Sequence, residues 1–226
     1  MVEFTFATEV GGFDSHIDSS IRGYQALWGD VLKFSEYFVE DETTVIDIGC
    51  STGRLLKAMK IQNDRFAPQC TYRGIEFESS FFPELEDEDR LTFEKLDVRN
   101  FDWEKKAINC CMVTSLFTLQ FLPKRDRQQL IEQIHDSLSK GGAFIFSEKL
   151  LSSTSQLEEM MTFCYYDWKR KHFSAEQILE KEEKLRHMMK PLCLDDLIVL
   201  VKSAGFRDIQ TFWQNFNFVG IIALKS

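Results

Sequence analysis

The sequence predicts an α/β fold in which one sheet of seven mostly parallel strands closes with an antiparallel strand. Three observations lead to this prediction. The segment TTVIDIGCSTGRLLKAM at 43–59 runs from β-branched residues through a glycine-bracketed loop into apolar positions at helical spacing. Apolar segments then alternate with helical ones, as in βαβ units. The last two strands, at 209–215 and 216–226, are joined too briefly for a crossover helix, so they should pair antiparallel.

Four more strands are expected between these two regions, at 71–77, 91–98, 108–117 and 143–149. The segment 108–117 is apolar on both faces, which is typical of a central strand in a parallel sheet.

Three helical regions accompany the later strands. Pro123 should open a helix whose buried face carries Leu130, Ile131, Ile134 and Leu138, and Gly141-Gly142 should end it. The segment 151–189 is long and rich in charged residues and contains no strand pattern, so we expect a helical insertion there. Residues 194–206 predict an amphipathic helix that ends at Gly205.

Composition and length favour a single domain over residues 1–226. The chain has 44% hydrophobic residues, which is enough for a sizeable core. No internal repeat, low-complexity segment or linker divides it.

Charge and cysteine content exclude several classes of protein. With 27 basic against 36 acidic residues, the net charge is −9, which argues against direct binding of nucleic acid. No apolar run reaches the ~18 residues of a membrane span, and the N-terminus lacks a signal-peptide pattern. The six cysteines form no CxxC pair, so we expect no metal site and a reducing, cytoplasmic setting.

The glycine loop between the first strand and its helix is the first candidate binding site. Asp47 and Gly49 lead into Cys50, Ser51, Thr52 and Gly53, and glycines let a loop pass against a ligand without a Cβ in the way. The glycine spacing differs from the G-x-G-x-x-G pattern of dinucleotide-binding proteins. A tight turn without any ligand remains the alternative.

Two further strand tips carry acidic residues. Glu76 ends the second strand and could accept hydrogen bonds from both hydroxyls of a ribose. Asp97, followed by the apolar Val98, ends the third strand at a position that suits adenine. Each acid alone would be an ordinary surface residue, but ligands of such folds bind at the carboxyl ends of strands.

This architecture resembles the class I S-adenosylmethionine (SAM) dependent methyltransferases, with residues 47–53 similar to their first motif. The chain also resembles, nearly end to end, the carboxy-SAM synthase family. The matching segments are FTF at 4–6, RGY at 22–24, DIGCS at 47–51, FTLQFLP at 117–123, GGAFIFSEK at 141–149, DWKR at 167–170, AGF at 204–206 and FNF at 216–218.

The resemblance implies a homodimer that converts SAM and prephenate to carboxy-SAM and phenylpyruvate, for a tRNA wobble-uridine modification pathway. SAM or carboxy-SAM is then the cofactor and the substrate is a small molecule. Residues 1–40 become a helical lid over the cofactor, and 151–189 the dimer contact. By position, Tyr24 should lie beside the methionine part of the cofactor and Gly49 under it, Glu76 on the ribose, and Asp97 and Val98 at the adenine.

Two residues depart from this family. Leu116 stands where the family has an asparagine. Glu182 aligns with the arginine that reaches in from the partner subunit to hold the carboxylate. Two facing carboxylates repel, so Lys181, Lys184 or Arg186 would have to compensate. Arg170 is expected in the same carboxylate-binding region.

These departures leave three hypotheses. The favoured one is a SAM-dependent methyltransferase acting on a small molecule. The alternatives are a carboxy-SAM synthase with a rebuilt clamp and a SAM-binding dimer without catalytic activity. No side chain stands out as a catalytic base, and none of the four histidines is assigned to catalysis.

Overall fold

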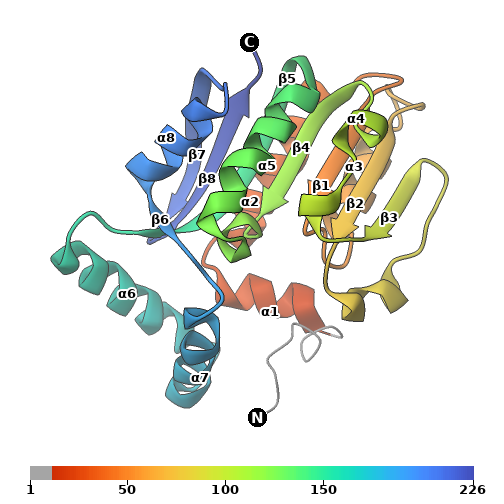
Figure 1. Cartoon of the computed structure of the whole chain (residues 1–226). Helices are drawn as coiled ribbons and strands as arrows, with labels where there is room; N and C mark the ends of the chain where they lie inside the picture. Colours follow the sequence, from red (N-terminus) through yellow and green to blue (C-terminus); the bar gives the residue numbers. More distant parts are fainter. Residues whose placement is uncertain (1–11) are drawn as a thin grey trace.

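In the computed structural model, which describes residues 12–226, an eight-stranded sheet has the order β3-β2-β1-β4-β5-β8-β7, with β6 paired to β5 alone (Figure 1). The strands are β1 Thr44–Ile48, β2 Thr71–Glu76, β3 Leu91–Lys95, β4 Cys110–Leu116, β5 Leu138–Leu151, β6 Leu192–Cys193, β7 Asp208–Asn215 and β8 Phe218–Leu224. β1 to β5 run parallel, and β8 runs antiparallel to both β5 and β7. The predicted fold class is therefore confirmed; the two-residue β6 was not anticipated.

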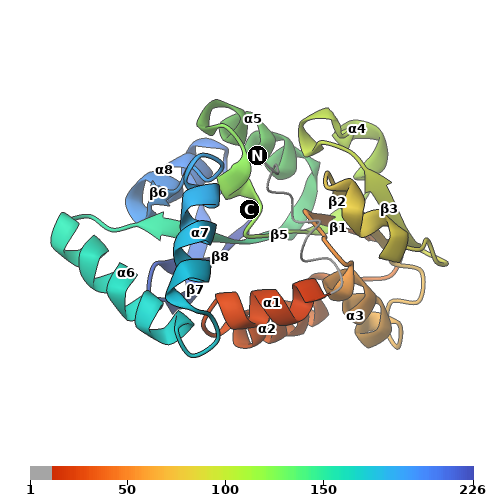
Figure 2. The ribbon, with the colours of Figure 1, turned by 90° about the horizontal axis from the view of Figure 1, so that it is seen from below.

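Helices cover both faces of the sheet, as the view along the strands in Figure 2 shows. The helices are α1 Phe13–Ser20, α2 Tyr24–Phe38, α3 Arg54–Asn63, α4 Trp103–Lys106, α5 Lys124–Ser137, α6 Ser155–Lys169, α7 Ala175–Arg186 and α8 Leu194–Ser203, with short 3₁₀ turns at Ser79–Glu84, Val98–Asn100 and Leu119–Phe121. α1, α2 and α3 pack on one face, and α4, α5 and α8 on the other.

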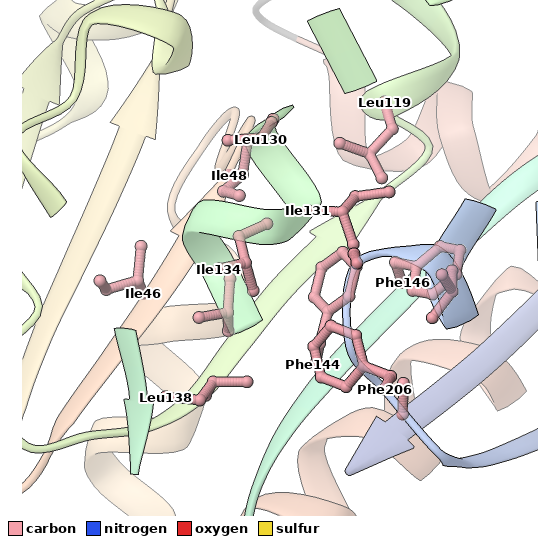
Figure 3. Close-up of a cluster of buried hydrophobic side chains, with 14 of the residues drawn as sticks. Ile46, Ile48, Leu119, Leu130, Ile131, Ile134, Leu138, Phe144, Phe146 and Phe206 are labelled. Atoms are coloured by element: carbon pink, nitrogen blue, oxygen red, sulfur yellow. The ribbon is translucent and has the colours of Figure 1, made fainter. Parts of the chain in front are cut away.

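The sheet separates two hydrophobic clusters because side chains alternate along each strand. Ile46 and Ile48 of β1 point toward α5, whereas Val45 points toward α2 and α3. Figure 3 shows the first cluster, where Phe144 and Phe146 of β5 stack with their ring centroids 4.7 Å apart. The stacked rings bury a large apolar area, which helps to hold the central strand β5 between the two helical layers.

Predicted boundaries differ from the structure at several elements. The strand expected at 91–98 ends at Lys95, and Asp97 caps the 3₁₀ turn that Val98 begins. α5 ends at Ser137, and Leu138 begins β5 instead of completing the helix. The predicted strand at 143–149 is thus longer at both ends. Gly141 has φ +81, and its N–H donates to Lys225 O at 2.7 Å, within a stretch where the β4–β5 register shifts. The glycine therefore serves an irregularity of the sheet, where a left-handed residue is needed.

The helical insertion and the N-terminal helices gather at the carboxyl ends of the strands. α6 and α7 stand apart from the sheet, and α1 lies below the strand ends (Figure 1). A capping box of Ser174 and Gln177 starts α7. Of the segment 1–40, predicted as a lid, FTF at 4–6 lies outside the described residues, and α1 and α2 form most of the part that is described.

Candidate cofactor and substrate site

A cavity of about 600 Å³ opens at the carboxyl ends of β1, β2, β4 and β5, and α1 and α7 contribute to its walls. In Figure 2, α7 crosses the middle of this end of the sheet with α1 beside it. The cavity brings together most of the residues predicted from sequence: Tyr24, Asp47, Gly49, Cys50, Ser51, Glu76, Asp97, Val98, Leu116, Lys181 and Glu182. Gly53, Arg170 and Arg186 do not line it.

The glycine loop is held in place from two sides. The N–H of Gly49 donates to Ile75 O at 2.8 Å, and a Cβ added to Gly49 would lie 2.2 Å from Thr118 Oγ1. With φ +72, Gly49 is the residue type that this close approach requires. Gly53 precedes α3, and a Cβ there would lie 2.7 Å from Phe93. Gly53 thus allows the loop to pack closely against Phe93.

Two buried carboxylates face the cavity at this loop. Glu76, 8% exposed, accepts hydrogen bonds from the N–H groups of Ser51 (2.9 Å) and Glu78 (2.8 Å), and its burial raises the pKa of this carboxyl. Asp47 accepts a hydrogen bond from the Thr114 hydroxyl at 2.6 Å. Burial raises the pKa of Asp47 to about 7, and the negative charge of Glu76 adds to the increase.

Such a pair of carboxylates is suited to a ligand that brings hydroxyl donors and positive charge. Ribose hydroxyls offer donors to a carboxylate, and the sulfonium and ammonium groups of SAM offer the charge. The residues present at this end of the cavity therefore fit SAM.

Apolar groups form the neighbouring wall, where sequence reasoning expected adenine. Val98 is buried, and Phe77, which is 72% exposed, lies directly after Glu76 at the tip of β2. Asp97 does not offer a free carboxylate: Arg99 Nη2 lies 2.6 Å from its Oδ2, and this hydrogen bond lowers the pKa of Asp97. Sequence reasoning missed Phe77, although its place after the acidic strand tip was a usable signal.

The N-terminal helices α1 and α2 form another wall of the cavity. The Tyr24 ring lies 6.2 Å from the Phe117 ring, and burial raises the pKa of its phenol, with the charge of Asp47 adding to the effect. The Thr52 hydroxyl donates to Asp14 Oδ1 at 3.1 Å, which connects α1 to the glycine loop. Leu116, in place of the family's asparagine, adds an apolar side chain to the wall.

The opposite end of the cavity is cationic. Lys149 of β5, Lys169 of α6 and Lys181 of α7 line it together with Glu182. Lys149 Nζ lies 3.5 Å from Glu182 Oε2. Lys181 contacts His16 of α1 through Nζ and Nε2. Neither Lys149 nor Lys169 was anticipated as a site residue, because only the tertiary structure brings β5, α6 and α7 together.

Two residues that were predicted for the carboxylate region, Arg170 and Arg186, do not line the cavity. Arg170 forms an ion pair with Asp167 at 2.9 Å and lies in a separate groove between α6 and α7. Arg186 is in the last turn of α7 and does not line the cavity. Among residues 12–226, no three His, Cys, Asp or Glu side chains are placed to hold a metal ion, and no helix is long and apolar enough to cross a bilayer.

Comparison with known proteins identifies the family. A family model described as a methyltransferase domain matches residues 46–144. The carboxy-S-adenosyl-L-methionine synthase of Staphylococcus epidermidis is 35% identical, over 99% of this chain and 97% of its own length. That of Nautilia profundicola is 28% identical over 99% and 95%. The chain belongs to the carboxy-S-adenosyl-L-methionine synthase family. It is a SAM-dependent transferase and SAM is its cofactor, in agreement with the fit of the cavity.

Solved structures agree on the fold. A putative O-methyltransferase from Nostoc punctiforme matches with a TM-score of 0.66 at 13% identity, over 97% of this chain and 60% of that one. Phosphoethanolamine N-methyltransferase 2 from Haemonchus contortus, solved with SAM, matches with a TM-score of 0.58 at 15% identity, over 88% and 52%. At these identities the matches support the class I methyltransferase fold alone.

Proposed function

We propose that this chain forms carboxy-SAM from SAM and prephenate. The observation that carries the proposal is the position of Glu182. Sequence reasoning favoured plain methyl transfer, because a glutamate in place of the family's arginine should repel a carboxylate. Here the carboxylate of Glu182 lies 3.5 Å from Lys149, and two more lysines line the same cavity. The charge that argued against an anionic substrate is thus compensated within the chain.

The proposed reaction balances without a further co-reactant. SAM supplies the methyl carbon that receives the carboxylate. Prephenate loses that carboxylate and its ring hydroxyl, the methyl proton leaves with the hydroxyl as water, and phenylpyruvate remains.

The chain's own residues bind and orient the reactants. Glu76 and Asp47 hold the cofactor end, and the lysines hold the acid. α1 and α7 form walls of the space between the two ends, and charged contacts in such a cavity are stronger than contacts in bulk water.

Mass spectrometry of the products tests this function. The purified chain is incubated with SAM and prephenate, and carboxy-SAM is expected. If the chain binds SAM but forms no carboxy-SAM, the proposal is wrong. Methyl transfer to a small molecule is the second candidate, and the observation in its favour is that a carboxylate at position 182 does line the cavity.

We further propose that the chain is a cytoplasmic homodimer joined through the helical insertion. Large apolar side chains are exposed there, namely Leu157, Met160, Phe163 and Leu179. An exposed apolar patch of this kind commonly marks an interface. All six cysteines are unpaired, which suits a reducing compartment.

A further inference from the structure

Lys169, the last residue of α6, is an unusual lysine. It is only 2% exposed, and it lines the cationic end of the cavity. Its ammonium nitrogen lies 5.1 Å from the centre of the Tyr165 ring and 5.8 Å from that of Phe173. Across residues 12–226, no oxygen accepts a hydrogen bond from this ammonium group, and no carboxylate lies within ion-pair distance of it.

An ammonium group on a side chain that is almost wholly removed from solvent, with no acceptor among the described residues, is poorly satisfied, and the two ring contacts compensate only in part. Burial lowers the pKa of Lys169, and the positive charge of Lys149 lowers it further, whereas Glu182 acts in the opposite direction. Glu182 forms its ion pair with Lys149 and lies beyond ion-pair distance of Lys169, so it does not supply the missing acceptor. An anion in the cavity would supply the missing acceptor.

We propose that Lys169 anchors a subsite for a carboxylate of the second substrate, with Lys149 and Lys181 beside it; this deepens the proposed function and rests on it. Three ammonium groups face one carboxylate here, so the subsite suits a small organic acid with two carboxylates. The subsite is built entirely within one chain, from β5, α6 and α7.

The chemistry of lysine predicts how this subsite recognises its ligand. An arginine fork fixes a carboxylate in one plane, whereas an ammonium group acts as a point charge on a flexible stem. The rings of Tyr165 and Phe173 limit that flexibility for Lys169. Glu182 holds Lys149 and reduces the positive charge, so removing its charge should strengthen binding of an acid.

Isothermal calorimetry with prephenate, in the presence of unreactive S-adenosylhomocysteine, tests the subsite. Lys169→Met should raise the Kd for prephenate about tenfold or more, in the range expected for a charge-assisted contact. Glu182→Gln should lower the Kd for prephenate. Lys60→Met is the matched control: Lys60 is half-buried in α3 and pairs with Glu88 at 3.1 Å, so prephenate binding should not change. The Kd for S-adenosylhomocysteine should stay the same in all three variants.

The outcomes separate this inference from the proposed function. If Lys169→Met binds prephenate as the wild type does, or if the wild type does not bind it, the subsite is wrong. Loss of S-adenosylhomocysteine binding in Lys169→Met would equally overturn it, because the residue would then support the whole fold. If prephenate binds in a Lys169-dependent manner but no carboxy-SAM forms, the subsite stands and the proposed reaction fails. If Lys169→Met produces carboxy-SAM with the wild-type KM for prephenate, the proposed reaction stands and the subsite is wrong.

Discussion

At the scale of single residues, Glu76 connects the cofactor to the loop that holds it. Its carboxylate accepts hydrogen bonds from Ser51 and Glu78, and its remaining lone pairs face the cavity. Glu76→Ala should weaken SAM binding by ~1–3 kcal/mol, the usual loss for a charged acceptor. Calorimetry measures this, with Glu88→Gln, an exposed carboxylate, as the control. Unchanged SAM binding in Glu76→Ala would refute this role of Glu76.

Glu148 makes stability depend on pH. Burial raises its pKa from 4.5 to about 8, although Arg127 and the N–H of Gln120, at 3.0 Å from Oε1, act against the shift. Between these values the folded chain keeps a proton that the unfolded chain releases. Stability should therefore fall as pH rises from about 5 to 8, by at most about 1.4 kcal/mol per pH unit for this one group.

Urea unfolding at pH 5, 6.5 and 8 checks this expectation. Glu148→Gln keeps an oxygen that can accept from Gln120 but cannot ionise, so its stability should vary less with pH than that of the wild type. Glu132→Gln, an exposed change on α5, should leave the slope as it is. Equal slopes for wild type and Glu148→Gln would contradict the prediction.

The sequence was informative about residues that lie at strand tips and uninformative about residues that meet across elements. Glu76 and Gly49 could be placed because their neighbours in sequence define the strand end and the loop. Lys149 and Lys169 lie on different elements, so no local pattern joins them. Asp97, predicted to lie at the adenine, lines the cavity, but its ion pair with Arg99 two residues later was not anticipated.

At the scale of elements, the glycine loop depends on one close approach between two segments. Ala at position 49 would place a methyl group 2.2 Å from Thr118 Oγ1 and keep an unfavourable φ of +72. Gly49→Ala should therefore lower the free energy of unfolding by roughly 1–3 kcal/mol and weaken SAM binding. Adding Thr118→Ala should restore the steric part of the loss but not the backbone part.

Gly29→Ala is the matched control for that prediction. Gly29 lies inside α2, and an added Cβ would meet nothing within 4 Å. The change should be neutral or stabilise by up to ~1 kcal/mol, since alanine favours a helix. Thermal unfolding and SAM titration of the variants give the comparison. A Gly49→Ala variant that behaves like Gly29→Ala would refute the close approach.

Element boundaries were the weakest part of the sequence prediction, and the end of α5 shows why. Leu138 continues the apolar spacing of Leu130 and Ile134, so periodicity extends the helix to it. Its pairing with Cys110 in β4 places it in the sheet instead. A long-range pairing of this kind outweighs a local pattern, and the glycines that seemed to end the helix serve the strand.

At the scale of the whole molecule, the sheet order brings distant segments to one end. β1, β2, β4 and β5 carry the cofactor loop, Glu76, Leu116 and Lys149, and α1, α6 and α7 line the space at the ends of these strands. The topology followed from the order of strands and helices along the sequence. The division of the cavity into an acidic and a cationic end did not, because it depends on how the insertion folds back over the sheet.

That insertion also presents an apolar surface. A groove between α6 and α7 is lined by Phe163, Tyr166, Arg170, Ala175, Ile178 and Leu179. Phe163 is 54% exposed and Leu179 is 57% exposed. A second copy of the chain that covers these side chains would remove them from water, with a gain of roughly 1.5–3 kcal/mol for each large side chain that is fully buried. We therefore expect a dimer of the 26.5 kDa chain.

Light scattering at micromolar concentration should report twice the chain mass for the wild type. Phe163→Asp places an unpaired charge in the proposed interface and should shift the particle to 26.5 kDa. Val199→Asp is the control, since Val199 is 61% exposed on α8, away from the groove, and should leave the dimer intact. Circular dichroism would verify that each variant is folded. A wild-type particle of 26.5 kDa, or a Phe163→Asp variant that remains dimeric, would show that this groove does not join two copies.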